Sequence, residues 1–84
     1  MYGTYANFEA LEGTVSGERL LSLARKSRKI VITNDHATKD LRYKFNGSEA
    51  FGTLQGTESL SLWFITKTII ISGNDIPYRV WVYG

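Results

Sequence analysis

The sequence predicts an all-β fold, a small antiparallel β-sandwich of six to eight short strands. Three observations carry this prediction. Apolar and polar residues alternate with a period of two in several short runs, which is the pattern of half-buried strands. Turn-forming segments rich in Gly, Asn, Asp and Ser separate these runs at intervals of about ten residues. Aromatic residues make up 13% of the chain, and Tyr and Trp favour sheets and contact surfaces.

The size and composition of the chain narrow the possible functions. Its 84 residues suffice for one domain whose core is thin, so association with copies or partners would help it. The absence of cysteine excludes a disulfide scaffold and a thiolate metal site. No apolar run approaches the roughly 18 residues of a membrane helix, and the first ten residues do not resemble a signal peptide. We therefore expect a protein made in the cytoplasm, with no membrane partner.

The first part of the chain is the less regular part. Residues 1–14 are expected to form an N-terminal arm or a first strand, and residues 15–84 the single sandwich domain. The segment 17–27 suits a helix with one apolar face and, equally, a strand that turns Leu21 and Leu23 inward.

The rest of the chain alternates clearly. The expected strands occupy residues 28–34, 41–45, 59–64, 67–72 and 78–83. Turn chemistry separates them at "NGSE" from residue 46, "GTLQGTE" from residue 52 and "SGNDIP" from residue 72. The inward-facing apolar residues predict a core of Ile30, Ile32, Leu41, Tyr43, Phe45, Leu60, Leu62, Phe64, Ile69, Ile71, Val80 and Val82.

The polar corner from Thr33 to Asp40 contains the only histidine, His36, next to Asp35. A catalytic histidine needs an orienting carboxylate and a nucleophile or substrate within reach. Adjacent side chains on a turn do not normally form such a pair, and Asn34 suits a turn position. A calcium site from Asn34, Asp35 and Asp40 has no recognisable loop spacing. We therefore predict a strand connection, with no catalytic residue, no metal and no cofactor.

Four basic residues lie close together at Arg25, Lys26, Arg28 and Lys29. Clustered cations beside aromatic rings can hold a nucleic-acid backbone, but the net charge of only +2 argues against a domain that depends on phosphate contacts. If these four residues do not bind nucleic acid, they form a solvated connection between two strands, or a basic patch that orients an acidic protein surface.

Large aromatic residues occupy the polar face of two expected strands. Trp63 lies opposite Leu62 and Phe64, and Trp81 and Tyr83 lie opposite the buried valines. Contiguous exposed aromatics mark interfaces, although a covering layer or stacking on a sugar would explain them as well. The expected partner interface comprises Trp63, Trp81, Tyr83 and Arg79, with Tyr2 and Tyr5 on the N-terminal arm.

The segments "RKIVITNDHATKDLRYKFN", "GTLQGTESLSLWF" and "KTIIISGNDIPYRVWVYG" resemble small β-sandwich virion structural proteins of tailed bacteriophages, such as capsid decoration, head-fibre and tail proteins. The resemblance covers residues 15–84 and carries strand and turn patterns without a chemical signature. It implies a jelly-roll-like sandwich, and it favours the strand over the helix for residues 17–27. It also implies a structural role in the virion, with copies of the chain and other capsid or tail proteins as partners.

We therefore expect a non-enzymatic virion protein that acts by protein–protein binding in a multi-copy assembly. The alternative is a carbohydrate-binding module that uses the same aromatic residues on a surface glycan. A nucleic-acid partner is less favoured than either.

Overall fold

A computed structural model describes residues 8–45 and 51–84. It contains six strands: β1 (Phe8–Ser22), β2 (Lys29–Asn34), β3 (Leu41–Phe45), β4 (Gly52–Leu54), β5 (Ser59–Trp63) and β6 (Thr68–Tyr83). The described ranges contain no helix, and accordingly none that is long and apolar enough to cross a membrane. The all-β prediction is confirmed.

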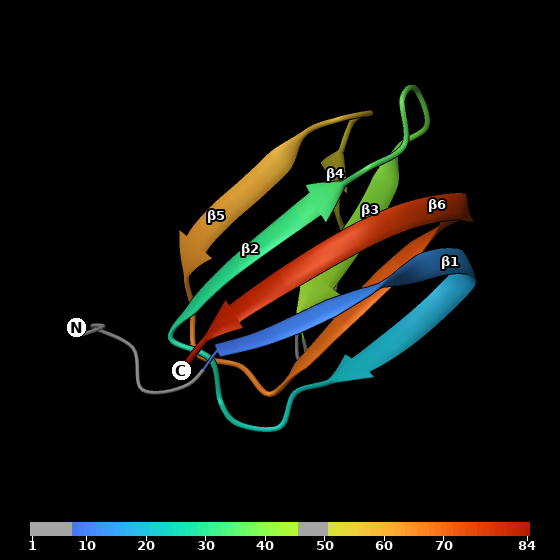
Figure 1. The fold of residues 1–84 in the computed structure, drawn as a ribbon. Coiled ribbons are helices and arrows are strands. Elements are labelled where there is room, and N and C mark those ends of the chain that lie inside the picture. Colours follow the sequence, from blue (N-terminus) through green and yellow to red (C-terminus); the bar gives the residue numbers. More distant parts are fainter. Residues whose placement is uncertain (1–7, 46–50) are drawn as a thin grey trace.

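The sheet is organised around β6 and is antiparallel throughout. Its strands follow the order β4-β3-β6-β2-β5, and β1 pairs with β6 outside this path. Residues 69–72 of β6 pair with β3, residues 78–83 pair with β2, and β1 runs beside β6 from end to end. Figure 1 shows that the β1–β6 ribbon doubles back, which places β5, β2 and the end of β6 in one layer and β3 and β4 in the other. The result is a small two-layered sandwich.

The doubling of the ribbon overturns one sequence expectation. The segment from Ser72 to Pro77 was expected to be a turn between two strands, but it lies inside β6, which has 16 residues. Its turn residues bend the strand without ending it: Asp75 has a φ of 62°, and the pairing with β1 shifts register at Val15/Ser16. Such irregularities kink a ribbon and increase its twist. The described residues therefore form six strands, within the predicted six to eight, but β1 and β6 are long instead of short, and β4 lies in the segment from residue 52 that was expected to be a turn.

The core lies between the layers and largely matches the predicted set. Ile30, Ile32, Leu41, Ile69, Ile71 and Val80 are completely buried and Val82 nearly so, while Tyr43, Phe45, Leu60 and Leu62 pack against them. Phe64 is the error, because it remains 40% exposed. β5 ends at Trp63, so Phe64 lies just beyond the strand, where its ring contacts Phe45 but is only partly covered. Residues that the sequence did not predict complete the core: Val15, Leu21, Leu23, Leu54, Ile76 and Tyr78.

The ambiguous segment 17–27 is a strand up to Ser22 and a loop beyond it. Leu21 pairs with Ile69 and is buried, so pairing with β6 decides between two local preferences that the sequence left equal. The boundary expected between residues 14 and 15 lies within β1. The proposed interface residues Tyr2 and Tyr5, and the turn at 46–49, lie outside the described residues.

Candidate interaction surface

The outward side of the β5–β2–β6–β1 layer carries an aromatic surface. Strand register places Trp63, Lys29, Tyr83 and Phe8 in one row across four strands. Trp81 pairs with Val31 and Ala10 in the next row, and Arg79 pairs with Thr33 and Glu12 in the row after that. We call this surface the outer aromatic face, and it comprises Phe8, Lys29, Trp63, Arg79, Trp81 and Tyr83.

The rings of the outer aromatic face support one another. The ring of Phe8 lies 5.2 Å from that of Tyr83 and meets that of Trp81 edge-on at 6.4 Å, between ring centroids. Lys29 Nζ lies 5.6 Å from the Trp63 ring and 6.0 Å from the Tyr83 ring. Ring–ring and cation–π contacts of this kind each contribute on the order of 1 kcal/mol. The side chains are therefore held in place before any partner arrives.

Arg79 fixes the far end of this face. Its guanidinium donates two hydrogen bonds to the carboxylate of Asp35, at 2.8 and 2.9 Å. It also lies 5.7 Å from the ring of Trp81. The hydrogen bond to Asp35, and then the negative charge of that carboxylate, raise the pKa of Arg79 above its ordinary value. Two-point binding holds the planar guanidinium against the tryptophan.

The large rings of this face are not covered by the described chain. Trp63 is 66% exposed, Phe8 58% and Trp81 37%. Beyond Trp63 the apolar surface continues, because Ile65 is 71% exposed. Trp63, Phe64 and Ile65 line an open hollow of about 530 Å³ together with Arg28. Phe64 packs on the inner side of this rim, 4.6 Å from the ring of Phe45.

The predicted interface residues Trp63, Trp81, Tyr83 and Arg79 thus come together on one face. Sequence reasoning missed Phe8 and Ile65. Phe8 joins the face only through the pairing of β1 with β6, which one sequence does not reveal. Ile65 carried no such signal, because period-two alternation does not show where a strand ends or which side chains beyond it stay exposed.

The basic run does not form one patch with this face. Lys29 belongs to the outer aromatic face, and Arg28 lines the hollow at its rim. Arg25 and Lys26 line a separate cavity of about 200 Å³ at the end of the sandwich, beside Phe8 and Val82. The four predicted steering charges therefore surround one end of the layer from different sides.

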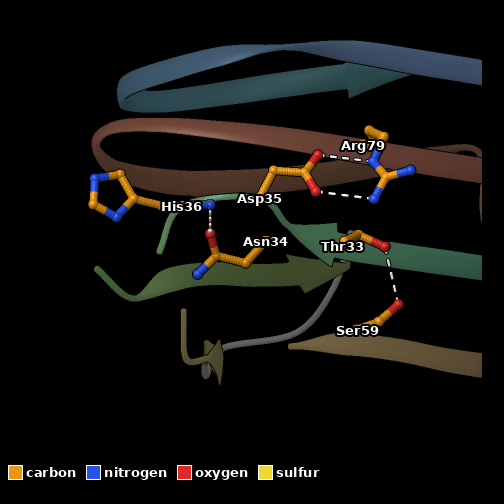
Figure 2. A network of polar contacts seen from close by, with 6 residues as sticks. All are labelled: Thr33, Asn34, Asp35, His36, Ser59 and Arg79. Atoms are coloured by element: carbon orange, nitrogen blue, oxygen red, sulfur yellow. Dashed lines mark hydrogen bonds and ion pairs between the residues drawn. The ribbon is translucent and has the colours of Figure 1, made fainter. Parts of the chain in front are cut away.

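The polar corner is organised as a strand connection around Asn34 (Figure 2). The Asn34 side chain is completely buried, and its amide donates to the backbone oxygens of Lys39, Leu54 and Gln55 at 2.7, 3.0 and 3.1 Å. Its oxygen accepts a hydrogen bond from the backbone N–H of His36 at 2.9 Å. One side chain thereby ties the corner to the loop that follows β4.

The His36 imidazole and the Asp35 carboxylate bind different partners. His36 Nδ1 accepts hydrogen bonds from the backbone N–H groups of Thr38 and Lys39, both at 3.0 Å. The imidazole and the Asp35 carboxylate point in opposite directions (Figure 2), and both carboxylate oxygens are bound by Arg79. Asp40 is exposed. Within the described residues no group of three or more His, Cys, Asp or Glu side chains could hold a metal ion.

The comparisons with known proteins find likeness at the level of the fold. No family model matches the chain, and no curated protein matches its sequence. A cupin-2 domain containing protein from Shewanella frigidimarina superposes with a TM-score of 0.57 at 14% identity, over 95% of this chain and 72% of that one. PirA gives a TM-score of 0.52 at 12% identity, over 89% and 93%.

The Drosophila melanogaster CENP-C cupin domain gives a TM-score of 0.51 at 10% identity, over 94% of this chain and 61% of that one. These identities are low, so the likeness concerns architecture alone. It agrees with the predicted jelly-roll type of β-sandwich, and the function has to be argued from the surface.

Proposed function

We propose that this chain is a binding protein that docks on other proteins through its outer aromatic face, as one component of a multi-copy assembly. The observation that carries the proposal is the exposure of Trp63 and Trp81 on one strand-built layer. Tryptophan and tyrosine are the residues that most often dominate interface energetics, and Arg79 adds a residue of the third common type. A contiguous exposed apolar patch of this kind marks a surface that another molecule covers.

The geometry suits binding because it is already ordered. The rings stand on paired strands and touch Lys29 or Arg79, so little side-chain freedom remains to be lost on docking. The hollow beside Trp63 could receive an apolar side chain of the partner, and the cations Arg28 and Lys29 favour an acidic rim opposite.

The assembly we propose is a phage virion, in the capsid or at the head and tail, with synthesis in the host cytoplasm. This part of the proposal is supported by the resemblance of residues 15–84 to small β-sandwich virion proteins. A rigid 84-residue sandwich suits repetition in a symmetric shell, where many weak contacts add up. The proposal assigns the chain no catalytic role, because the corner's His36 and Asp35 are engaged in separate structural contacts.

The test is binding of the purified chain to separated heads and tails of the phage that encodes it. We expect co-sedimentation with one of the two fractions. Trp81→Ala should weaken that binding about tenfold or more, the loss typical of a central aromatic anchor. Leu20→Ala is the matched control, since Leu20 is 59% exposed but lies on β1 opposite Ile70, in the other layer. Unchanged binding of Trp81→Ala, or no binding of the wild-type chain, would contradict the proposal.

A second candidate function, glycan binding, is favoured by the exposed indole of Trp63 beside Lys29. Sugars stack on such rings, but the side chains of Phe64 and Ile65 beside it offer no hydrogen bond to a hydroxyl, which leaves Arg28 and Lys29 as the donors near the ring. A tryptophan-fluorescence titration with oligosaccharides separates the two functions. It should stay flat for a protein-docking surface and saturate for a glycan site.

A further inference from the structure

Among the residues that the structure describes, three strands have an outer edge: β1, β4 and β5. An exposed edge presents unpaired backbone N–H and C=O groups and can pair with another chain, so natural edges are shortened, bulged or charged. β4 has only three residues. β1 carries Glu9, Glu12, Glu18 and Arg19, and its pairing is interrupted at Val15/Ser16. Both of these edges are therefore protected against pairing.

β5 has none of these protections. Its sequence, Ser-Leu-Ser-Leu-Trp, contains no charged residue, no proline and no glycine, and it pairs with β2 over its full length without a bulge. It ends the strand order of the sheet. An uncharged, regular edge flanked by exposed apolar residues is the kind that accepts a further strand.

The backbone groups at this edge can be assigned from the pairing with β2. Asn34 N–H donates to Glu58 O at 2.9 Å, and Phe64 N–H donates to Arg28 O at 3.0 Å. Residues 58 and 64 therefore point their backbone groups toward β2, and by the antiparallel alternation so do Leu60 and Leu62. The intervening Ser59 and Ser61 point theirs away from β2, toward the outer edge.

We propose that β5 pairs antiparallel with β5 of a second copy, about a two-fold axis at Ser61. In this register Ser61 exchanges both backbone hydrogen bonds with Ser61 of the second copy. Leu60 lies opposite Leu62 of the other copy on the inner side, and Ser59 lies opposite Trp63 on the outer side. The β5–β2–β6–β1 layers of the two copies become one continuous sheet.

The edge's own chemistry favours a second copy over a foreign strand. The register is self-complementary, because each Leu meets a Leu and no like charges are opposed across β5. Leu60 and Leu62 are only half-buried in the single chain although they pack against the core, and the leucines of a second copy would cover them further. Glu58, just outside β5, lies opposite Phe64 of the other copy and meets no carboxylate.

The experiment is sedimentation equilibrium of the full chain from micromolar to millimolar concentration, with charges placed on the axis. The wild-type chain should form a dimer. Ser61→Lys opposes two ammonium groups across the axis and should raise the dimer Kd about tenfold or more. Ser61→Glu should do the same, and an equimolar mixture of the two variants should recover a heterodimer. Ser61 is exposed, so both variants should keep the far-UV circular dichroism of the folded chain.

Ser22→Lys is the matched control, because Ser22 is exposed at the end of the β1 edge and should leave the dimer intact. A wild-type chain that stays monomeric throughout overturns the inference. So does a dimer that Ser61→Lys leaves unchanged, or a mixture of the Lys and Glu variants that fails to associate. Phage particles do not enter this test, so the dimer and the proposed function can fail independently.

Discussion

Asn34 offers the sharpest test of how the polar corner is held, through the substitution Asn34→Ala. The side chain is completely buried: its oxygen accepts from the backbone N–H of His36, and its two N–H donors serve the backbone oxygens of Lys39, Leu54 and Gln55, so one N–H is shared between two of them. Each such bond contributes about 1 kcal/mol net, and partners left buried without a bond cost more. We therefore expect Asn34→Ala to lower the free energy of unfolding by about 4 kcal/mol. A domain of this length has only about 4–13 kcal/mol in total.

The near-isosteric Asn34→Asp separates hydrogen-bond chemistry from volume. It replaces the donating amide, which faces three backbone oxygens, with a second oxygen. The folded state then favours the protonated acid, so the pKa of the introduced carboxyl is higher in the folded than in the unfolded chain, where it is about 3.9. The folded state binds more protons above that value. The variant's stability should therefore be greatest at acidic pH and fall as the pH rises above about 4.

Both variants are measured by urea denaturation followed by tryptophan fluorescence, at one low protein concentration so that association does not contribute. Thr33→Ala is the control. It removes one hydrogen bond at the surface, the 2.9 Å contact with Ser59, and should cost less than about 1 kcal/mol. A loss below about 1 kcal/mol in Asn34→Ala would refute the reasoning, as would an Asn34→Asp variant that is more stable at neutral than at acidic pH.

Two further predictions concern the same region. Gly56→Ala should destabilise the domain by about 1–3 kcal/mol, because the added Cβ would lie 2.5 Å from the backbone oxygen of Ala37. A thermal melt measures the loss, and an unchanged midpoint would show that the two loops are free to separate. Asp35→Asn should leave the urea midpoint nearly unchanged, since its ion pair with Arg79 is exposed to solvent. A large loss on Asp35→Asn would show instead that the pair holds the corner in place.

Local alternation predicted the parts of the fold that depend on one strand at a time. The runs at Leu41–Phe45 and Ser59–Trp63 became β3 and β5, and their inward residues joined the core. The same alternation failed at Phe64, because a periodic pattern does not mark the residue at which a strand ends. It failed again at residues 72–77, whose turn chemistry bends β6 without ending it.

The candidate surface was predictable in part, because alternation within one strand assigns each side chain to a face of the sheet. Trp63, Trp81 and Tyr83 could be placed on an outward face from their own strands. The composition of the whole face depends on register between strands far apart in the sequence, as with Phe8 beside Tyr83. That register is set by the irregularity at Val15/Ser16 and by the bend of the β1–β6 ribbon, and neither follows from a period in the sequence.

The most direct test of docking through the outer aromatic face is hydroxyl-radical footprinting, read by mass spectrometry. The footprint of the free chain is compared with that of the chain in purified particles of the phage that encodes it. If the outer aromatic face docks on its neighbours, Trp63 and Trp81 should react readily in the free chain and be protected in the particle, while Leu20 on the other layer reacts to a similar extent in both. Equal reactivity of the two tryptophans in both states, or particles that lack the chain, would contradict the account.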